Sequence, residues 1–514
     1  MNNGSRTKNS IHNISVGFIV TVVNTLITFI SRKVLVIILG DEALGLNGLF
    51  GEVIAMLSLA ELGIGMAIVY SLYKPISEND EKKISQLMGL YRSAYNMVAL
   101  VTFLLGLLIT PFVDKLITDI NYPLPFIRTI FVLFVIRTSS SYLFSYKTSL
   151  LNADQKQYIV SIITVVVKTV MTSAIIICLL VYKNYIFYLI LLIIQNLVIN
   201  LVLSWRVDKI YPFINYKETI DRAEKKQIFD NIRNVFIKRV SGVITNSTDH
   251  ILISVFVSTI QVCFYDNYIL LFSVVKTIKQ HITNGLAASI GNLMVTSNND
   301  NCINVLKKLT YMYFVFAMIM TSGLMGGASI FIKIWLGEKY IMSCAIVYVA
   351  IFNLFLDICG DPLWQFLEVS GLFEKDKNIG LIGSSINLVV SLLLVMKMGM
   401  IGIFIGTACT LIIQIMLKTI LLFKDKFDKA FTEYAVMWCK MLIGYGLLVI
   451  VQCFMINHIS HNSDIVTFLL KCGISVVVAF IISVSIFLNS NESKYLFENA
   501  KNYLNNRIDM IWKR

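Results

Sequence analysis

The chain of 514 residues is too apolar for a soluble protein, since 57% of its residues are apolar, 15% are charged, and the mean hydropathy is +0.75. A soluble chain carries about a quarter charged residues. The formal charge of +13 does not indicate a nucleic-acid partner, because the basic residues outside the apolar runs gather in loops predicted on one side of a membrane. Nine scattered cysteines form no CxxC pair and show no zinc-ligand spacing, which is typical of small buried residues.

The apolar residues form runs of about 20 to 28 residues, the length that a hydrocarbon layer of about 30 Å requires of a helix. These runs lack the alternation of barrel strands, so they predict transmembrane helices. The first run is too long for a signal-peptide core and has no small-residue cleavage site, so we expect no cleaved signal. The predicted fold class is all-α, a polytopic membrane protein with about 14 transmembrane helices. In chain order the predicted spans are 13–39, 44–73, 88–113, 122–150, 158–182, 184–205, 231–257, 262–296, 309–335, 341–369, 379–398, 400–423, 434–457 and 463–488.

The basic residues of the loops predict the orientation. With a cytoplasmic N-terminus, the inner segments hold about 26 Lys and Arg residues and the outer segments about four. The positive-inside rule then places both termini in the cytoplasm, which requires an even number of spans.

The longest inner loop, Arg206 to Asp230, divides the chain into six spans, six spans and two spans. The predicted domains are an N-terminal six-helix lobe (1–205), a cytoplasmic inter-lobe linker (206–230), a C-terminal six-helix lobe (231–423), two appended transmembrane helices (424–488) and a cytoplasmic amphipathic tail (489–514).

The first span of each predicted lobe carries a polar stripe at helical spacing. The stripes consist of Gly17, Thr21, Asn24, Thr28 and Ser31 in the first span and of Asn234, Lys238, Gly242, Thr245 and Asp249 in the seventh. Small and polar residues at this spacing are also typical of ordinary helix contacts. Their corresponding places favour two parallel halves that face a shared cavity.

Two stretches carry a resemblance to a known family. They are residues 39–76, LGDEALGLNGLFGEVIAMLSLAELGIGMAIVYSLYKPI, and residues 245–256, TNSTDHILISVF, with Tyr265-Asp266-Asn267-Tyr268 after it. These resemble the second span, the seventh span and the start of the eighth span of the polysaccharide-transport (Wzx-type) oligosaccharide flippases, in the multidrug/oligosaccharidyl-lipid/polysaccharide exporter superfamily. His250 stands where the family pattern often has Asn, so no role is carried over to it. The resemblance implies two six-span lobes around a central cavity, and alternating-access export of an undecaprenyl-pyrophosphate-linked oligosaccharide for surface polysaccharide.

Ionisable residues inside the predicted spans are costly, and they normally face a cavity or one another. Basic groups outnumber acidic ones by about ten to six, so we expect some cations to remain for an anionic headgroup. The candidate substrate-binding residues, proposed to hold a diphosphate, are Arg32, Lys33, Arg137, Lys238, Lys276 and Lys279. The candidates for ion coupling or for pairing are Glu52, Glu61, Asp249, Asp357 and Asp361.

Two arrangements among these residues are specific. Arg32 and Glu52 lie at similar depths on sequential antiparallel spans, which predicts an ion pair. Asp357 and Asp361 precede Pro362, which is expected to kink or break its helix. Both a plain structural kink and a coupling-ion site fit that second pattern.

The sequence therefore predicts a transporter and not an enzyme, with no catalytic residues, no metal site and no cofactor apart from a coupling ion, H⁺ or Na⁺. Its expected partners are a polyprenyl-pyrophosphate-linked glycan, membrane lipid, and polysaccharide polymerase and export proteins, in a bacterial plasma membrane. A peptidoglycan-precursor flippase shares the cationic cavity and stays open. A cation-coupled multidrug antiporter of the same fold is disfavoured, because basic residues prevail. A membrane glycan polymerase or ligase needs a long outer loop, whereas the longest here, Asp114 to Asn121, has about eight residues.

Overall fold

The computed structural model describes residues 3–61, 64–221, 247–456, 458–459, 462–488 and 490–495, together with positions 225, 226, 228 and 498. Helices make up nearly all of these residues, and no strand occurs among them. Eleven helices of this described part are long and apolar enough to cross a membrane. The predicted fold class, an all-α polytopic membrane protein, is confirmed.

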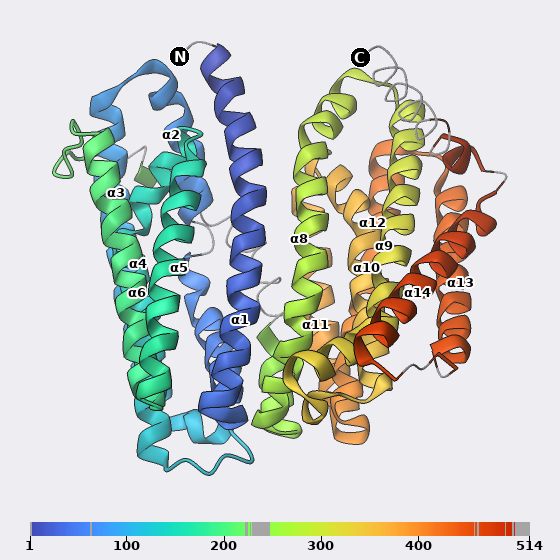
Figure 1. The fold of residues 1–514 in the computed structure, drawn as a ribbon. Helices are drawn as coiled ribbons and strands as arrows, with labels where there is room; N and C mark the ends of the chain where they lie inside the picture. Colours follow the sequence, from blue (N-terminus) through green and yellow to red (C-terminus); the bar gives the residue numbers. More distant parts are fainter. Residues whose placement is uncertain are drawn as a thin grey trace, which may run out of the picture. The chain divides into compact units, whose positions relative to one another are not determined.

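The chain divides into two compact units, unit 1 (Met1–Cys263) and unit 2 (Phe264–Arg514), and each is described by itself (Figure 1). The helices of unit 1 are α1 (Asn3–Leu57), α2 (Ile64–Glu78), α3 (Glu81–Ile109), α4 (Leu124–Ala153), α5 (Gln157–Val181) and α6 (Tyr185–Ile210), with the short turns η1 (Ser58–Glu61) and η2 (Thr110–Leu116). Residues 247–256 are also helical.

Unit 2 contains most of α8, whose first turn belongs to unit 1, and all the helices after it. Their bounds are α8 (Thr259–Thr296), α9 (Asn299–Leu336), α10 (Cys344–Val369), α11 (Phe373–Met398), α12 (Met400–Leu422), α13 (Phe431–Ile456) and α14 (Asp464–Ile486), with the short turns η3 (Glu338–Tyr340) and η4 (Phe423–Phe427).

The first two predicted spans run together in α1, and Gly40 marks their junction. Its φ of +80° is a left-handed conformation that glycine adopts without a Cβ clash. The second predicted span, 44–73, is divided among the end of α1, η1 and α2. The predicted number of 14 spans stays a prediction, because residues 229–246 lie outside the described part.

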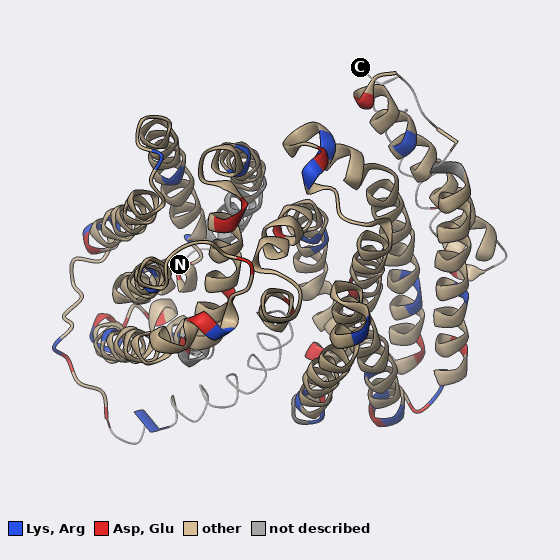
Figure 2. Cartoon of the chain, turned by 90° about the horizontal axis from the view of Figure 1, so that it is seen from below, with Lys and Arg blue, Asp and Glu red and all other residues tan. Residues whose placement is uncertain are grey.

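Charged residues are sparse along the helices of both units. Figure 2, which views the helices nearly end-on, shows them mostly tan, with the blue and red positions few and scattered. Many large apolar side chains are exposed instead, including Ile37, Leu108 and Phe454, each of which is at least 67% exposed. Apolar surface of this kind suits a lipid environment, where helices pair all their backbone groups internally.

A docked segment, residues 211–221, follows α6 and packs on unit 1. Tyr216 contacts Tyr146 edge-on, and both Arg92 and Lys147 lie over its ring at 5.5 Å. Lys147 is buried and donates to both carboxylate oxygens of Asp208, at 2.7 and 2.6 Å. The first half of the predicted linker is therefore packed against unit 1 as part of its structure.

Residues 247–263 also pack on unit 1, through a buried hydrogen-bonded junction. Thr118 donates through its N–H to Thr259 Oγ1 at 3.0 Å and through its hydroxyl to the Ser254 carbonyl at 2.7 Å. Ser254 Oγ donates to the Leu116 carbonyl at 2.6 Å. The predicted lobe boundaries, with a second lobe from residue 231, stay a prediction, and the contacts place the described residues 247–263 with unit 1.

Candidate functional site

Two cations lie near each other on neighbouring helices of unit 1. Arg137 on α4 and Lys168 on α5 are both half-buried, and they are close enough for their charges to repel. No carboxylate in the described part of the chain lies within ion-pair distance of either one. We call Arg137 and Lys168 the cationic pair.

Amide side chains of α6 hold the backbone next to the cationic pair. Asn196 Nδ2 donates to the Arg137 carbonyl at 3.1 Å. Gln195 Nε2 donates to Thr172 Oγ1 at 2.9 Å and to the Lys168 carbonyl at 3.3 Å. Gln195 and Asn196 are consecutive residues of α6, so one turn of that helix bonds to both α4 and α5 next to the two charges.

Two tyrosines extend this polar region toward α1. Tyr185 and Tyr188 are buried and interact electrostatically with Arg137, and Tyr188 also interacts with Arg32. Tyr185 donates its hydroxyl to Asn47 Oδ1 at 2.9 Å. Tyr188 thus lies within electrostatic range of both predicted arginines, Arg32 and Arg137.

The predicted Arg32–Glu52 pair is replaced by other contacts. Arg32 Nη2 donates to the Cys263 carbonyl at 3.0 Å, and Glu52 Oε2 accepts from Ser247 Oγ at 2.7 Å. Among the described residues no ion pair joins Arg32 to Glu52. Both new partners come from residues 247–263. The predicted pair rests only on the depths of Arg32 and Glu52 in their spans, and depth does not reveal that residues 247–263 pack on unit 1.

The other acidic candidates of unit 1 have separate environments. Glu61 in η1 contacts the hydroxyl of Tyr142 and lies within electrostatic range of Tyr95. Asp249 is buried, with 7% of its surface exposed. Lys238 lies outside the described residues, as does most of the predicted stripe of the seventh span. In the first span the hydroxyls of Thr21 and Thr28 donate to carbonyl oxygens one turn earlier in α1, so their hydrogen bonds are made within that helix.

In unit 2, three predicted residues meet in one cluster. Lys279 Nζ on α8 lies 2.9 Å from Asp357 Oδ2 and 3.2 Å from Asp361 Oδ1, both on α10. Lys279 is predicted to hold substrate, but here two carboxylates take up its charge. Lys276, one turn earlier, is exposed, and Lys33 on α1 is exposed as well.

The sequence predicts a kink or a break at Pro362. A break is wrong, because α10 continues through Pro362 from Cys344 to Val369, whereas the kink stays a prediction. The residues around it, Asp361 to Leu363, are buried, so packing on both flanks supports the helix where one backbone N–H is missing. The two aspartates therefore lie one turn apart on a continuous helix.

Several polar partners at these sites were missed by the sequence reasoning. Thr283, Tyr313 and Gln365 complete the cluster of unit 2, and Gln195 and Asn196 flank the cationic pair. A signal did exist for part of this set, because Asp357, Asp361 and Gln365 repeat every four residues and so share one face of α10. The neighbour across that face is set by tertiary packing.

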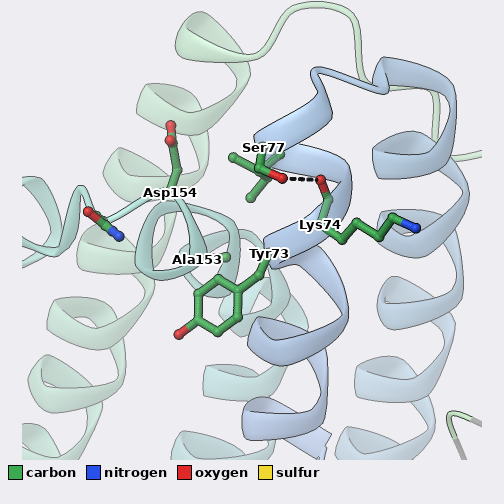
Figure 3. A pocket seen from close by; sticks show the side chains of 7 residues that line it. Tyr73, Lys74, Ser77, Ala153 and Asp154 are labelled. Atoms are coloured by element: carbon green, nitrogen blue, oxygen red, sulfur yellow. Dashed lines mark hydrogen bonds between the residues drawn. The ribbon is translucent and has the colours of Figure 1, made fainter. Parts of the chain in front are cut away.

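A surface groove of about 470 Å³ lies at the end of unit 1 where α2 meets the α4–α5 turn, with Tyr73, Ser77 and Asp154 among its lining residues (Figure 3). Figure 3 shows the Lys74 ammonium pointing away from Asp154. Asp154 is held by the Tyr211 hydroxyl and by Lys156 Nζ, each at 2.6 Å. This groove contains none of the predicted site residues.

Several solved structures have a similar fold over most of the length of this chain. The lipid II flippase MurJ, in an inward closed conformation, matches with a TM-score of 0.67 and 14% identity over 92% of this chain and 98% of that one. An inward-facing MATE-family multidrug transporter of the MOP superfamily matches with 0.62 and 13% identity, over 79% and 96%. The MATE transporter VcmN of Vibrio cholerae gives 0.58 and 13% identity, over 84% and 99%.

These likenesses show that the chain has the fold of flippases and transporters of that superfamily. No curated protein matches the sequence. The family model described as polysaccharide biosynthesis protein matches residues 10–284, more than half of the chain. The chain is therefore a multi-pass membrane protein that belongs to the polysaccharide biosynthesis protein family.

Proposed function

We propose that this protein is a flippase, and not an enzyme, that moves an undecaprenyl-pyrophosphate-linked oligosaccharide across a bacterial plasma membrane by alternating access, for export of surface polysaccharide. The observation that carries the proposal is the cationic pair. Arg137 and Lys168 lie in helices long and apolar enough to span a membrane, within range of each other's charge and with no carboxylate partner among the described residues.

Two neighbouring cations without an acid are unfavourable in a bilayer, and they are normally retained for function. A diphosphate bears about two negative charges, and it needs several donors when it leaves water. The Arg137 guanidinium offers a planar fork of donors, whereas Lys168 offers a compact charge.

Such binding has to be modest, because a transporter that holds its substrate too tightly cannot release it on the other side. Two half-buried cations satisfy this condition better than a dense cluster does. The predicted participation of Arg32, Lys33, Lys238 and Lys276 in one shared cavity stays a prediction.

The family and the fold support this substrate class. The matching family is described by polysaccharide biosynthesis, and the MurJ structure is named for flipping lipid II. A peptidoglycan precursor carries the same diphosphate, so the cationic pair does not separate the two substrates. Family membership favours the polysaccharide precursor.

The test is export of the lipid-linked glycan by charge variants. Arg137→Ala and Lys168→Met should each lower the export rate about tenfold or more, since a hydrogen bond to a charged group contributes about 1.5–3 kcal/mol. Arg137→Lys should keep part of the activity. The matched control is Arg128→Ala, an exposed arginine on the same helix that contacts Asp114 and the Pro111 carbonyl.

Surface glycan and membrane-inserted protein are measured together, so that a loss of expression is not counted as a loss of transport. Normal export by well-inserted Arg137→Ala and Lys168→Met would show that the cationic pair is structural, and it would remove the basis of the proposal. Accumulation of a peptidoglycan precursor in place of the glycan precursor would favour the other flippase.

We further propose that Asp357 and Asp361 couple transport to an ion gradient, as carboxylates in an apolar setting can exchange a cation. Export by Asp357→Asn and Asp361→Asn is compared with and without an imposed pH or Na⁺ gradient. Loss of the gradient dependence is expected in at least Asp361→Asn, which is the more buried. Unchanged dependence in both variants would leave the cluster a structural one.

A further inference from the structure

The cluster around Lys279 joins three helices of unit 2. Lys279 and Thr283 come from α8, Tyr313 from α9, and Asp361 and Gln365 from α10. The Lys279 side chain is 10% exposed and that of Asp361 is 12% exposed. Lys279 and Asp361 are therefore largely out of contact with solvent, whereas the side chain of Asp357 is 30% exposed.

The cluster around Lys279 contains the kinds of atom that bind hard cations. Oxygen ligands from carboxylates, amides and hydroxyls are typical of such sites. The cluster offers the carboxylates of Asp357 and Asp361 and the Thr283 and Tyr313 hydroxyls, which lie 3.0 Å from each other. Gln365 adds an amide whose Oε1 is buried and has no hydrogen-bond partner.

The ammonium contacts both carboxylates of this oxygen set. Lys279 Nζ lies 2.9 Å from Asp357 Oδ2 and 3.2 Å from Asp361 Oδ1. Asp361 Oδ2 accepts from Thr283 Oγ1 and, at 2.9 Å, from Gln365 Nε2. Three of the four carboxylate oxygens are thus engaged by protein donors, so a metal ion would have to displace the ammonium to gain more than one of them.

We propose that the Lys279 ammonium is a built-in cation that occupies a Na⁺-type site, so that the native cluster binds no Na⁺ and removal of the ammonium opens a site for it. The inference deepens the proposed coupling role of Asp357 and Asp361, and it rests on that role for its meaning in transport. One lysine and two aspartates carry a net charge of −1. A proton, which needs no coordination shell, is the cation that this arrangement can still accept.

The experiment measures Na⁺ binding to the purified full-length chain in detergent. The midpoint of thermal unfolding, Tm, is recorded in NaCl and in choline chloride at equal ionic strength, and ²²Na⁺ binding is measured in parallel. The native protein should show equal Tm values and no saturable ²²Na⁺ binding. Lys279→Ala should bind ²²Na⁺ saturably, with a Tm that rises with the logarithm of Na⁺ concentration above the Kd.

Three further variants separate a cation site from a general salt effect. Lys279→Arg keeps a cation in place and should stay insensitive to Na⁺. The double variant Lys279→Ala with Asp361→Asn should lose the Na⁺ binding again. Lys307→Ala is the control, because it removes a lysine from a different ion pair of unit 2, the one with Glu433. It should respond to NaCl as the native protein does.

The inference would be overturned if the native protein bound ²²Na⁺ saturably and Asp361→Asn removed that binding. This test does not require any Lys279 variant to fold. A folded Lys279→Ala protein that ignores Na⁺ would overturn it as well. Export by Arg137→Ala tests the proposed function in unit 1 and does not enter these readouts. The two can therefore fail separately.

Discussion

At the scale of single residues, the cations inside this protein have two kinds of environment. Lys279 in unit 2 and Lys147 in unit 1 are both buried lysines, and each has a carboxylate within 3 Å. Arg137 and Lys168 are half-buried and have each other as charged neighbours. Pairing explains the first two residues structurally, because an unpaired buried ammonium is strongly unfavourable. The cationic pair has no such explanation, and it is the better candidate for an anionic ligand.

Gly89 provides a residue-scale test of the docked segment 211–221. A Cβ at this position of α3 would lie 2.9 Å from the Tyr216 carbonyl oxygen and 3.0 Å from that of Glu218. Gly89→Ala should lower stability by about 1–3 kcal/mol, the usual cost of overpacking. It should also speed trypsin cleavage after Lys217, an exposed residue, because the displaced segment can enter the protease more easily.

The matched control is Gly446→Ala in α13, where a new Cβ would have no atom within 4 Å. There the better helix propensity of alanine should raise stability by up to about 1 kcal/mol. Thermal unfolding and limited proteolysis are measured for both variants. If Gly89→Ala is as stable as this control and is cleaved no faster, the close approach of residues 211–221 to α3 is not a stabilising contact.

At the scale of elements, the docked segment shows how a predicted loop gains structure. Its polar sequence indicates a connection between lobes, yet Tyr216 is held by Tyr146 and by two cations. Burial raises the pKa of the Tyr216 phenol, so the group stays protonated and donates to Asp208 Oδ1 at 3.2 Å. Local sequence does not reveal such contacts, because their partners lie on three other helices.

The helices α8 and α10 illustrate the opposite case. Each carries its cluster residues at intervals of four, Lys279 with Thr283 and Asp357 with Asp361, so one face of each helix is readable in advance. What the pattern leaves open is which faces meet. The predicted role of Lys279 as a substrate ligand comes from counting charges, whereas the structure pairs that charge with α10.

At the scale of the whole molecule, the orientation in the membrane is a prediction that topology reporters can check. Basic residues crowd the loops predicted to be inner, so both termini are expected in the cytoplasm. Alkaline phosphatase, which is active only outside the cytoplasm, should be inactive when fused near Lys225 and active near Asp119. The reverse activities would invert the orientation, and activity at both sites would contradict the predicted number of spans between them.

The fold likeness at 14% identity has a physical cause that also explains what the sequence predicts well. A spanning helix needs a long apolar run whatever its detailed residues, so the fold class and most helix positions follow from hydropathy alone. The resemblance of residues 39–76 and 245–256 likewise indicated the family, and the match over residues 10–284 confirms it.

The partners of the polar residues were decided by the tertiary structure. Arg32 and Glu52 were predicted to pair, but residues 247–263 supply the Cys263 carbonyl and the Ser247 hydroxyl in their place. Lys279 was assigned to substrate, but α10 brings two aspartates to it. The reason is that apolar burial depends on composition over a whole span, whereas a hydrogen bond or ion pair depends on placing two atoms within about 3 Å. That placement comes from packing between segments far apart in the chain.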